Sequence, residues 1–255
     1  MSKRVVVVLV EGPTDGIALS GNLNHLVKDK TIEFEPTGGD ITSDESFIAT
    51  EDLNDVLVQY VKDLIAKTSD FALEDVLEVV HLIDTDGLYI PDERIIQKRL
   101  PEGTYMTEED KRAIYNDDSI EALDVSSERE TLKNKRDSVR DLLAMKSLDF
   151  GRGERKPYFL YYNSCNLEHA LHNQRNVAML EKRILARKFA NDFYQNDEKF
   201  ITLFDELNQA RTWDLSASWA YLKNGFNSLQ RGSNFLLYLR KLNPEVVDRF
   251  AKMTK

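Results

Sequence analysis

Near the start of the chain stands the run VVVVLV, residues 5–10, followed at once by EGPTD, residues 11–15. Six consecutive apolar residues, five of them valine, predict a strand buried on both faces, as in the middle of a parallel sheet. The run ends on Glu11, after which glycine and proline turn the chain towards a helix. A carboxylate in this place lies at the carboxyl edge of the sheet, where open α/β folds have their functional sites. Glu11 is therefore the first candidate site residue.

The following segments continue the alternation of strands and helices. Apolar residues at helical spacing predict helices over 14–28 and 51–67, and strands are expected over 31–36, 76–83 and 158–162. Alternating strands and helices are typical of a parallel sheet with crossover helices. We therefore expect an α/β fold with a Rossmann-like parallel sheet of about four strands and flanking helices.

The third and fourth strands are separated by a long, highly charged segment over about 91–157. We interpret it as an insertion with a helix around Asp118 to Met145 and a loop-like end over 151–157. Beyond the fourth strand, helices are predicted over 167–173, 177–195, 198–209, 216–229 and 233–242, and Asn243-Pro244 stops the last. We expect residues 1–170 to form the α/β domain and residues 171–255 a helical C-terminal subdomain.

Charge divides the chain of 255 residues unevenly, although the net charge is −10. Residues 1–150 hold 17 Lys and Arg against 33 Asp and Glu, a net charge of −16, whereas residues 151–255 hold 17 against 11, a net charge of +6. An acidic half suits a cation and a basic half suits a polyanion, although a helical half rich in Lys and Arg explains the basic excess equally well.

Targeting and redox signals point to a soluble, cytoplasmic protein. The N-terminal apolar run is too short for a signal peptide, and nowhere do about 18 apolar residues follow one another, so no membrane span or membrane partner is expected. The single cysteine, Cys165, allows no internal disulfide and no cysteine-based zinc site, and we interpret it as a small packing residue.

Acidic residues follow three of the predicted strands: Glu11, then Asp84 and Asp86, then Glu168. Because the first and third strands can be neighbours in a doubly wound sheet, their carboxylates would crowd one crevice. Crowded carboxylates repel one another unless a divalent cation neutralises them, and an all-oxygen ligand set favours Mg²⁺ or Mn²⁺ over Zn²⁺. Such an ion is suited to phosphate chemistry.

The segments Val8–Asp15 and, about 70 residues later, His81–Gly87 together resemble the TOPRIM domain, which primases, topoisomerases, small RNA-processing nucleases and OLD-family nucleases share. The family pattern is a Glu after the first strand and Asp-x-Asp after the third, and the resemblance covers roughly residues 3 to 170. It implies that Glu11 is a metal ligand or a general acid or base, and that Asp84 and Asp86 bind Mg²⁺.

Further residues match the family less strictly. Asp15 matches a second acid of the nuclease-like members, and Gly38-Gly39 resembles the glycines after the second strand. The segment 166–172 resembles the Glu-bearing helix of small TOPRIM proteins from defence systems, which makes Glu168 a candidate metal ligand. The long insertion departs from the minimal domain, and Asp15 and Glu168 are also explained by first-turn helix positions.

The resemblance narrows the function, because the chain has no room for a strand-passage body or a polymerising module. It implies a stand-alone Mg²⁺-dependent endonuclease acting on DNA or RNA, and a role as an effector of anti-phage defence. It also implies that a partner ATPase or another regulatory protein controls the activity, and it leaves room for a homo-oligomer.

Two other functions remain open. The segment 80–88 also resembles the first motif of haloacid-dehalogenase-type phosphatases, in which Asp84 would be the nucleophile and Asp86 the acid or base, but that motif normally lies on the first strand. The non-enzymatic alternative is a TOPRIM-fold interaction module regulated by a partner ATPase.

Other residues carry weaker signals for binding or catalysis. Arg152, Arg155 and Lys156 are candidates for substrate binding, although a solvated loop explains them as well. His169 and His172 adjoin Glu168 but are interpreted as surface or packing residues, and the C-terminal aromatic residues as core.

Overall fold

The computed structural model describes residues 4–27, 32–38, 52–68, 70–100 and 106–252. Its main sheet contains four parallel strands in the order β2 (Ile32–Gly38), β1 (Arg4–Val10), β3 (Val76–Asp84) and β8 (Arg155–Ser164). The short strands β7 (Ser147–Asp149) and β9 (Gly232–Ser233) pair antiparallel with the two ends of β8. The expected α/β fold with a four-stranded parallel sheet is confirmed, and the first and third strands are neighbours.

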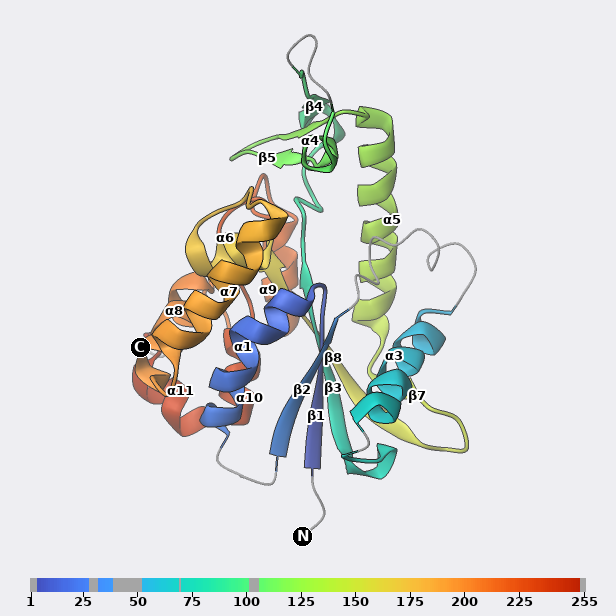
Figure 1. The fold of residues 1–255 in the computed structure, drawn as a ribbon, viewed down its shortest axis with the longest axis vertical. Coiled ribbons are helices and arrows are strands. Elements are labelled where there is room, and N and C mark those ends of the chain that lie inside the picture. The colour runs from blue at the N-terminus through green and yellow to red at the C-terminus, as the bar shows by residue number, and fades with distance from the viewer. Residues whose placement is uncertain (1–3, 28–31, 39–51, 69, 101–105, 253–255) are drawn as a thin grey trace.

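Helices cover both faces of this sheet (Figure 1). One face carries α1 (Pro13–Leu26), α6 (Leu167–His172), α7 (Met179–Phe193), α8 (Asp197–Leu207), α10 (Leu236–Leu242) and α11 (Pro244–Phe250). The other face carries α3 (Leu53–Thr68), α5 (Val125–Ala144) and α9 (Leu215–Leu222). In β1, Val6, Val8 and Val10 enter the first core and Val5, Val7 and Leu9 the second, as expected for a strand buried on both sides.

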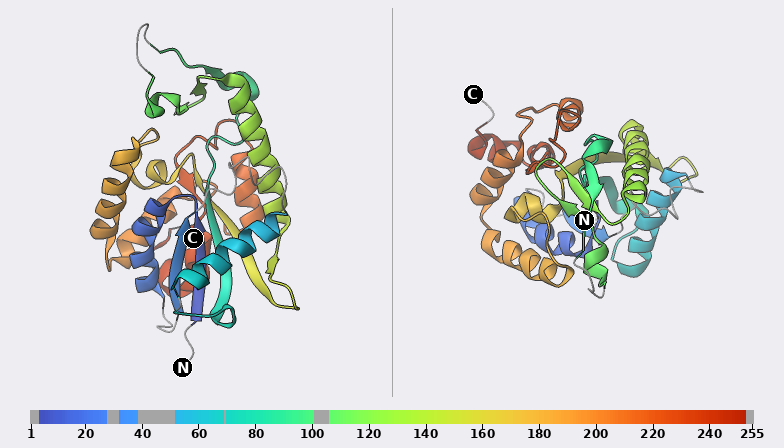
Figure 2. Two further views of the ribbon diagram at one scale, coloured as in Figure 1. Left: turned by 45° about the vertical axis from the view of Figure 1, so that its right-hand side comes forward. Right: turned by 90° about the horizontal axis from the view of Figure 1, so that it is seen from above.

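The insertion builds a small second sheet beyond the carboxyl ends of the main strands (Figures 1 and 2). It contains β4 (Ile95–Gln97), β6 (Ile120–Ala122) and β5 (Ile114–Tyr115), with the short helix α4 (Glu108–Lys111) beside it. Single 3₁₀ turns lie at Leu73–Asp75 and Asp92–Arg94. The helix α5 then leads the chain back to the main sheet, and so connects the small second sheet to β7 and β8.

Several predicted boundaries are wrong for local reasons. The helix expected from Asp118 begins only at Val125, because Asp124 caps it by accepting hydrogen bonds from two backbone amides and residues 120–122 pair with β4 instead. The expected loop at 151–157 contains the start of β8, which forms a hairpin with β7. Strands of two or three residues are too short for periodicity to reveal.

The C-terminal helices also differ from the prediction. The helix expected over 216–229 ends at Leu222, and the one expected from Ser233 begins at Leu236 because Gly232 and Ser233 pair with β8. Asn243-Pro244 ends α10 at Leu242, as expected, and also starts a further helix, α11, with the Asn243 side chain as its cap. The division at residue 170 stays a prediction. In the structure the C-terminal helices share one core with α1 and β1.

Among the described residues, the structure contains no helix that is both long and apolar enough to cross a membrane.

Candidate functional site

A cleft of about 430 Å³ opens at the carboxyl edge of the main sheet. One wall carries the acids Glu11, Asp15, Asp84 and Asp86, which follow β1 and β3. The facing wall is made by side chains of the insertion and of α7, which include Arg112, Tyr115, Glu128, Lys135, Met179 and Lys182. The predicted acids therefore meet at one place, and the insertion covers them.

Strand pairing brings these acids together. Val10 lies beside Leu82 in the register of β1 and β3, so that Glu11 is level with Ile83 and Asp84 follows one residue later on the neighbouring strand. The loop after β3 is anchored through Thr85, whose hydroxyl donates to the Ser228 carbonyl and accepts from the Cys165 amide, both at 2.8 Å. This anchoring fixes the acids on either side of Thr85.

The backbone turns sharply behind that anchor. Asp86 and Gly87 have φ values of 48° and 72°, and the Asp86 amide donates to the Cys165 carbonyl at 2.9 Å. A Cβ atom on Gly87 would lie 2.8 Å from Leu229 Cδ2, so glycine is required by space as well as by backbone conformation. The turn directs the Asp86 carboxylate towards the insertion.

Asp84 has the least favourable surroundings for a negative charge among these acids. It is 9% exposed, and its carboxylate has no hydrogen-bond or ion-pair partner within the described part of the chain. Burial raises its pKa well above the usual range, and the repulsion of nearby carboxylates raises it further. These carboxylates belong to Glu11, Asp15, Asp86 and Glu168.

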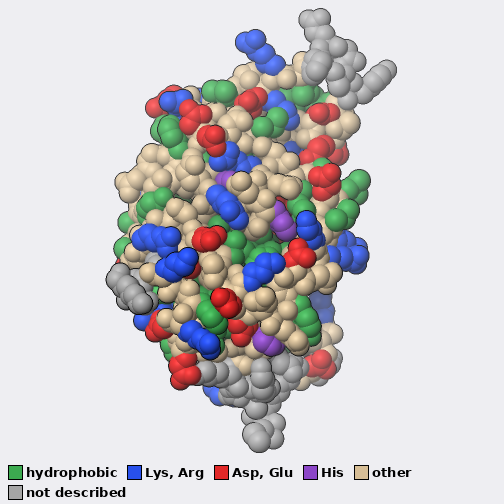
Figure 3. Space-filling view, turned by 90° about the vertical axis from the view of Figure 1, so that its left-hand side faces the viewer, with side chains coloured by type: hydrophobic (Ala, Val, Ile, Leu, Met, Phe, Trp, Pro, Cys, Tyr) green, Lys and Arg blue, Asp and Glu red, His purple; other side chains and the backbone are tan. Residues whose placement is uncertain are grey.

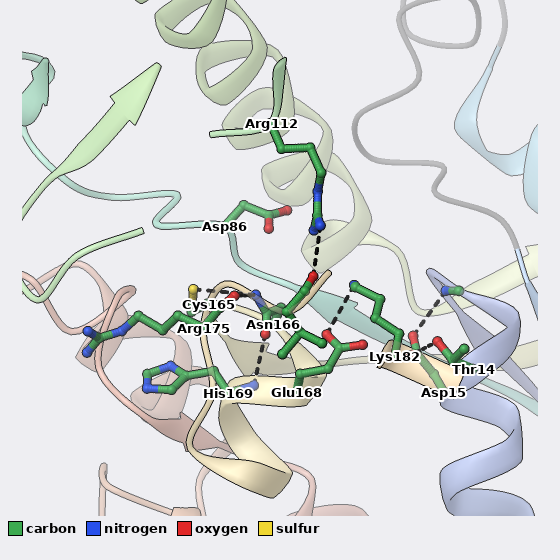
Figure 4. Close-up of polar contacts among 12 residues, drawn as sticks. Thr14, Asp15, Asp86, Arg112, Cys165, Asn166, Glu168, His169, Arg175 and Lys182 are labelled. Atoms are coloured by element: carbon green, nitrogen blue, oxygen red, sulfur yellow. Dashed lines mark hydrogen bonds and ion pairs between the residues drawn. The ribbon is translucent and has the colours of Figure 1, made fainter. Parts of the chain in front are cut away.

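Asp15 and Glu168 form the second half of the acidic cluster, beside Lys182 (Figure 4). The Asp15 carboxylate accepts a hydrogen bond from the Gly12 amide at 3.0 Å, as a helix-capping acid does, and burial raises its pKa to about 6. Glu168, in the first turn of α6, pairs with Lys182 at 3.1 Å. Burial alone lowers the pKa of Lys182, but the neighbouring carboxylates outweigh it and the pKa is raised.

Lys135 pairs with the other two acids. Its Nζ lies 3.1 Å from Glu11 Oε1 and 2.5 Å from Asp86 Oδ2, and its side chain is only 1% exposed. The other oxygen of Asp86, Oδ1, accepts a hydrogen bond from the Tyr115 hydroxyl at 3.3 Å. Both oxygens of the Asp86 carboxylate are therefore held by side chains of the insertion.

Sequence reasoning missed Lys135, Lys182 and Tyr115. The signal for Lys135 was present, because it occupies the buried stripe of α5 that also contains Leu132, Val139 and Leu142. A lysine in the apolar stripe of a helix is expected to have a buried acidic partner. Lys182 lies on a helix with several other basic residues, and Tyr115 lies in a two-residue strand, so neither had a distinguishing pattern.

The predicted substrate-binding residues lie elsewhere. Arg152, Arg155 and Lys156 are at the start of β8, the end opposite to Glu168, where Arg155 pairs with Asp149 and Lys156 with Glu154. The structure does not bring them to the acidic cleft. Their role in substrate binding stays a prediction.

Four other residues singled out in the sequence are placed as follows. The ring of His172 packs against Phe189. Burial lowers the pKa of His169 to about 4, and in Figure 4 its ring points away from Lys182. Burial raises the pKa of the Cys165 thiol, which makes it a poor nucleophile. Gly38 ends β2, and Gly39 lies outside the described residues.

The donor set fits a magnesium or manganese ion. In the ranges that the structure describes, no three Asp, Glu, His or Cys side chains form a ready-made metal cluster. Mg²⁺ does not need one, because it is usually held by one or two carboxylates and otherwise by water. Asp84 offers a buried carboxylate without a partner, in a cleft wide enough for water. The cleft therefore suits a water-rich oxygen site centred on Asp84.

A comparison of the chain with protein-family models, with curated proteins and with solved structures found no match.

Proposed function

We propose that the chain is a divalent-metal-dependent nuclease of the TOPRIM type, which hydrolyses phosphodiester bonds of DNA or RNA in the acidic cleft. The observation that carries this proposal is Asp84. It is a buried carboxylate without a partner in the described chain, surrounded by four others at the carboxyl edge of a parallel sheet. Such a group is costly unless a cation joins it.

Each side chain of the cleft has a role consistent with this reaction. Asp84 would hold the ion, with Asp15 and Glu168 as the neighbouring acids. When bound, the ion supplies positive charge to a phosphoryl oxygen and makes water a stronger acid. Glu11, held in place by Lys135, can accept the proton that attacking water loses.

Positive side chains on the facing wall suit a phosphate. Arg112 and Lys182 line the cleft, where Arg112 pairs with Glu109 at 2.6 Å and Lys182 with Glu168 at 3.1 Å, and a phosphate backbone would share these cations with their carboxylates. The volume of about 430 Å³ falls within the range of about 300–1,000 Å³ that small-molecule pockets have, enough for one nucleotide unit.

The outer surface indicates little intrinsic sequence recognition. On the face that carries α6, α7 and α8, Lys and Arg side chains are scattered among acidic and apolar ones instead of forming one continuous patch (Figure 3). Substrate choice would then depend on the shape of the nucleic acid or on a partner protein. Control by a partner ATPase and a role in antiviral defence rest on the family resemblance alone.

The test is a cleavage assay over several classes of nucleic acid. Purified protein would be incubated with duplex DNA, single-stranded DNA, ribosomal RNA and transfer RNA, with Mg²⁺, Mn²⁺ or EDTA. We expect cleavage that EDTA abolishes. Glu11→Gln and Asp84→Asn should each lower the rate by about a hundredfold or more, since a general base contributes about 10²–10⁴-fold and a metal contact is worth several kcal/mol.

A matched control is Asp248→Asn on α11, where Asp248 pairs with Arg240 at the surface. It should cleave at the wild-type rate. The same nucleic acids would also be examined in cells that express the protein, because the cell can supply a partner protein that the purified assay lacks. Intact substrates in all these conditions, or full activity of Glu11→Gln, would contradict the proposal.

The phosphatase alternative finds less support. In that alternative the aspartate motif normally lies on the first strand, whereas Asp84 ends β3, and the alternative gives Glu11 no role. Detection of a covalent aspartyl phosphate at Asp84 would favour that alternative.

A further inference from the structure

The acids of the cleft are neutralised unequally by the chain itself. Glu11 and Asp86 share the ammonium group of Lys135, and Asp86 also accepts the Tyr115 hydroxyl. Glu168 has Lys182. Asp84 is repelled by the carboxylates of both pairs, and it has neither a hydrogen bond nor an ion pair in the described part of the protein.

Lys135 is a fixed part of the fold. Three residues before it, Leu132 packs into the small core of the insertion with Ile120, and four residues after it, Val139 packs into the core under the main sheet. A helix anchored on both sides holds the backbone of Lys135 in place beside the cleft. The side chain, 1% exposed, extends to the carboxylates of Glu11 and Asp86 and supplies a positive charge to the cleft.

That position is where a second divalent ion would have to bind. In a two-ion site the ions share carboxylates from both sides, and here the carboxylates of Glu11 and Asp86 are already joined by a cation. An incoming ion between them would meet the positive charge of Lys135, and like charges repel more strongly at a partly buried site than in bulk water.

We infer that Lys135 takes the place of a second metal ion, so that the cleft binds one Mg²⁺ or Mn²⁺ ion, on the Asp84 side. The inference rests on the proposed function, because it concerns the metal of the same site. It assigns the insertion a chemical task, which is to supply the second positive charge of the site from the chain itself.

The test counts ions and does not depend on activity. Mn²⁺ would be titrated into the full-length protein, with bound ions counted by calorimetry and by loss of the free-ion electron paramagnetic resonance signal. We expect one ion per chain. Two ions would overturn the inference and leave the proposed function standing, whereas no bound ion would overturn the proposed metal dependence itself.

Variants then test the role of the lysine. Lys135→Met removes the ammonium group that Glu11 and Asp86 share, and we expect it to bind a second Mn²⁺, whereas Lys135→Arg keeps the charge and should bind one. Lys98→Met is the matched control, because Lys98 is also buried in the insertion but donates to the backbone carbonyls of Asp110 and Arg112. It should bind one ion.

A folded Lys135→Met protein that still binds one ion would overturn the inference. Near-ultraviolet circular dichroism would establish the folded state of each variant. Should Lys135→Met not fold, the number of ions bound by the wild-type protein still decides the question.

Discussion

Acid should destabilise this protein through His81, a fully buried residue of β3. Its Nδ1 lies 2.8 Å from the Tyr158 hydroxyl, and its Nε2 has no hydrogen-bond partner. Burial lowers the pKa of His81 to about 3, and the charge of Lys135 contributes in the same direction. In the unfolded chain the ordinary pKa is 6.5. Below about pH 6.5, His81 therefore takes up a proton in the unfolded chain but not in the folded protein, which favours unfolding.

The size of the effect follows from the difference between the two pKa values. At about pH 5, some 1.5 units below the unfolded value, His81 should cost about 2 kcal/mol of unfolding free energy relative to about pH 8. The loss should continue to grow until the pH reaches the folded pKa. His81→Asn removes the titrating group and keeps a partner for Tyr158, so this part of the pH dependence should vanish.

The assay is urea denaturation of both proteins from about pH 8 to about pH 5 in EDTA, with the difference in unfolding free energy taken at each pH. Taking the difference cancels the carboxylates common to both proteins. Tyr158→Phe is the control, because it loses the hydrogen bond but retains the buried imidazole, and so should keep the wild-type slope. A difference between wild type and His81→Asn that does not change with pH would refute the reasoning.

Three further predictions concern stability in the absence of metal, each measured by urea denaturation. Asp84→Asn should raise the unfolding free energy at neutral pH by about 1 kcal/mol or more, because it removes a buried carboxylate that has no partner. Most substitutions instead lower the unfolding free energy, by about 0.5–3 kcal/mol. A lower unfolding free energy of Asp84→Asn would contradict the claim that this carboxylate destabilises the fold. Gly87→Ala should cost about 2–5 kcal/mol through its positive φ and its clash with Leu229, whereas Gly21→Ala, in open space on α1, should be neutral or gain up to about 1 kcal/mol. Asn243→Ala should cost about 1–2 kcal/mol, because the side chain caps α11 and its amide donates to the Leu26 carbonyl; an unchanged midpoint would show that the cap is dispensable.

The sheet and its functional edge could be predicted because their signals are local and long. An unbroken apolar run such as residues 5–10, short and rich in valine, favours a strand with cores on both faces, and α3 shows a clear apolar stripe. Acids directly after such strands must lie at the carboxyl edge, whatever the crossover helices do. Glu11, Asp84 and Asp86 were therefore placed correctly, and Asp15 and Glu168 lie beside them.

The insertion could not be predicted in the same way. Strands of two or three residues, such as β5, are too short to have a measurable periodicity, so their pairing partners cannot be identified from the sequence. The hairpin of β7 and β8 depends likewise on a partner strand that is three residues long. Arg155 and Lys156 were consequently expected in a loop and lie at the start of β8, at the end of the sheet opposite to the acidic cleft.

The sequence by itself therefore determined which carboxylates lie at the carboxyl end of the sheet, because each directly follows a strand that its apolar pattern reveals. Only the tertiary structure decided how those carboxylates are neutralised. Lys135 is 124 residues from Glu11 in the chain, and Lys182 belongs to another helix. Whether a charged side chain meets a carboxylate or water depends on how helices pack over the sheet edge, and that packing is set by contacts from the whole chain. The valine run before Glu11 indicates where the site lies, and Lys135 on α5 neutralises two of its carboxylates.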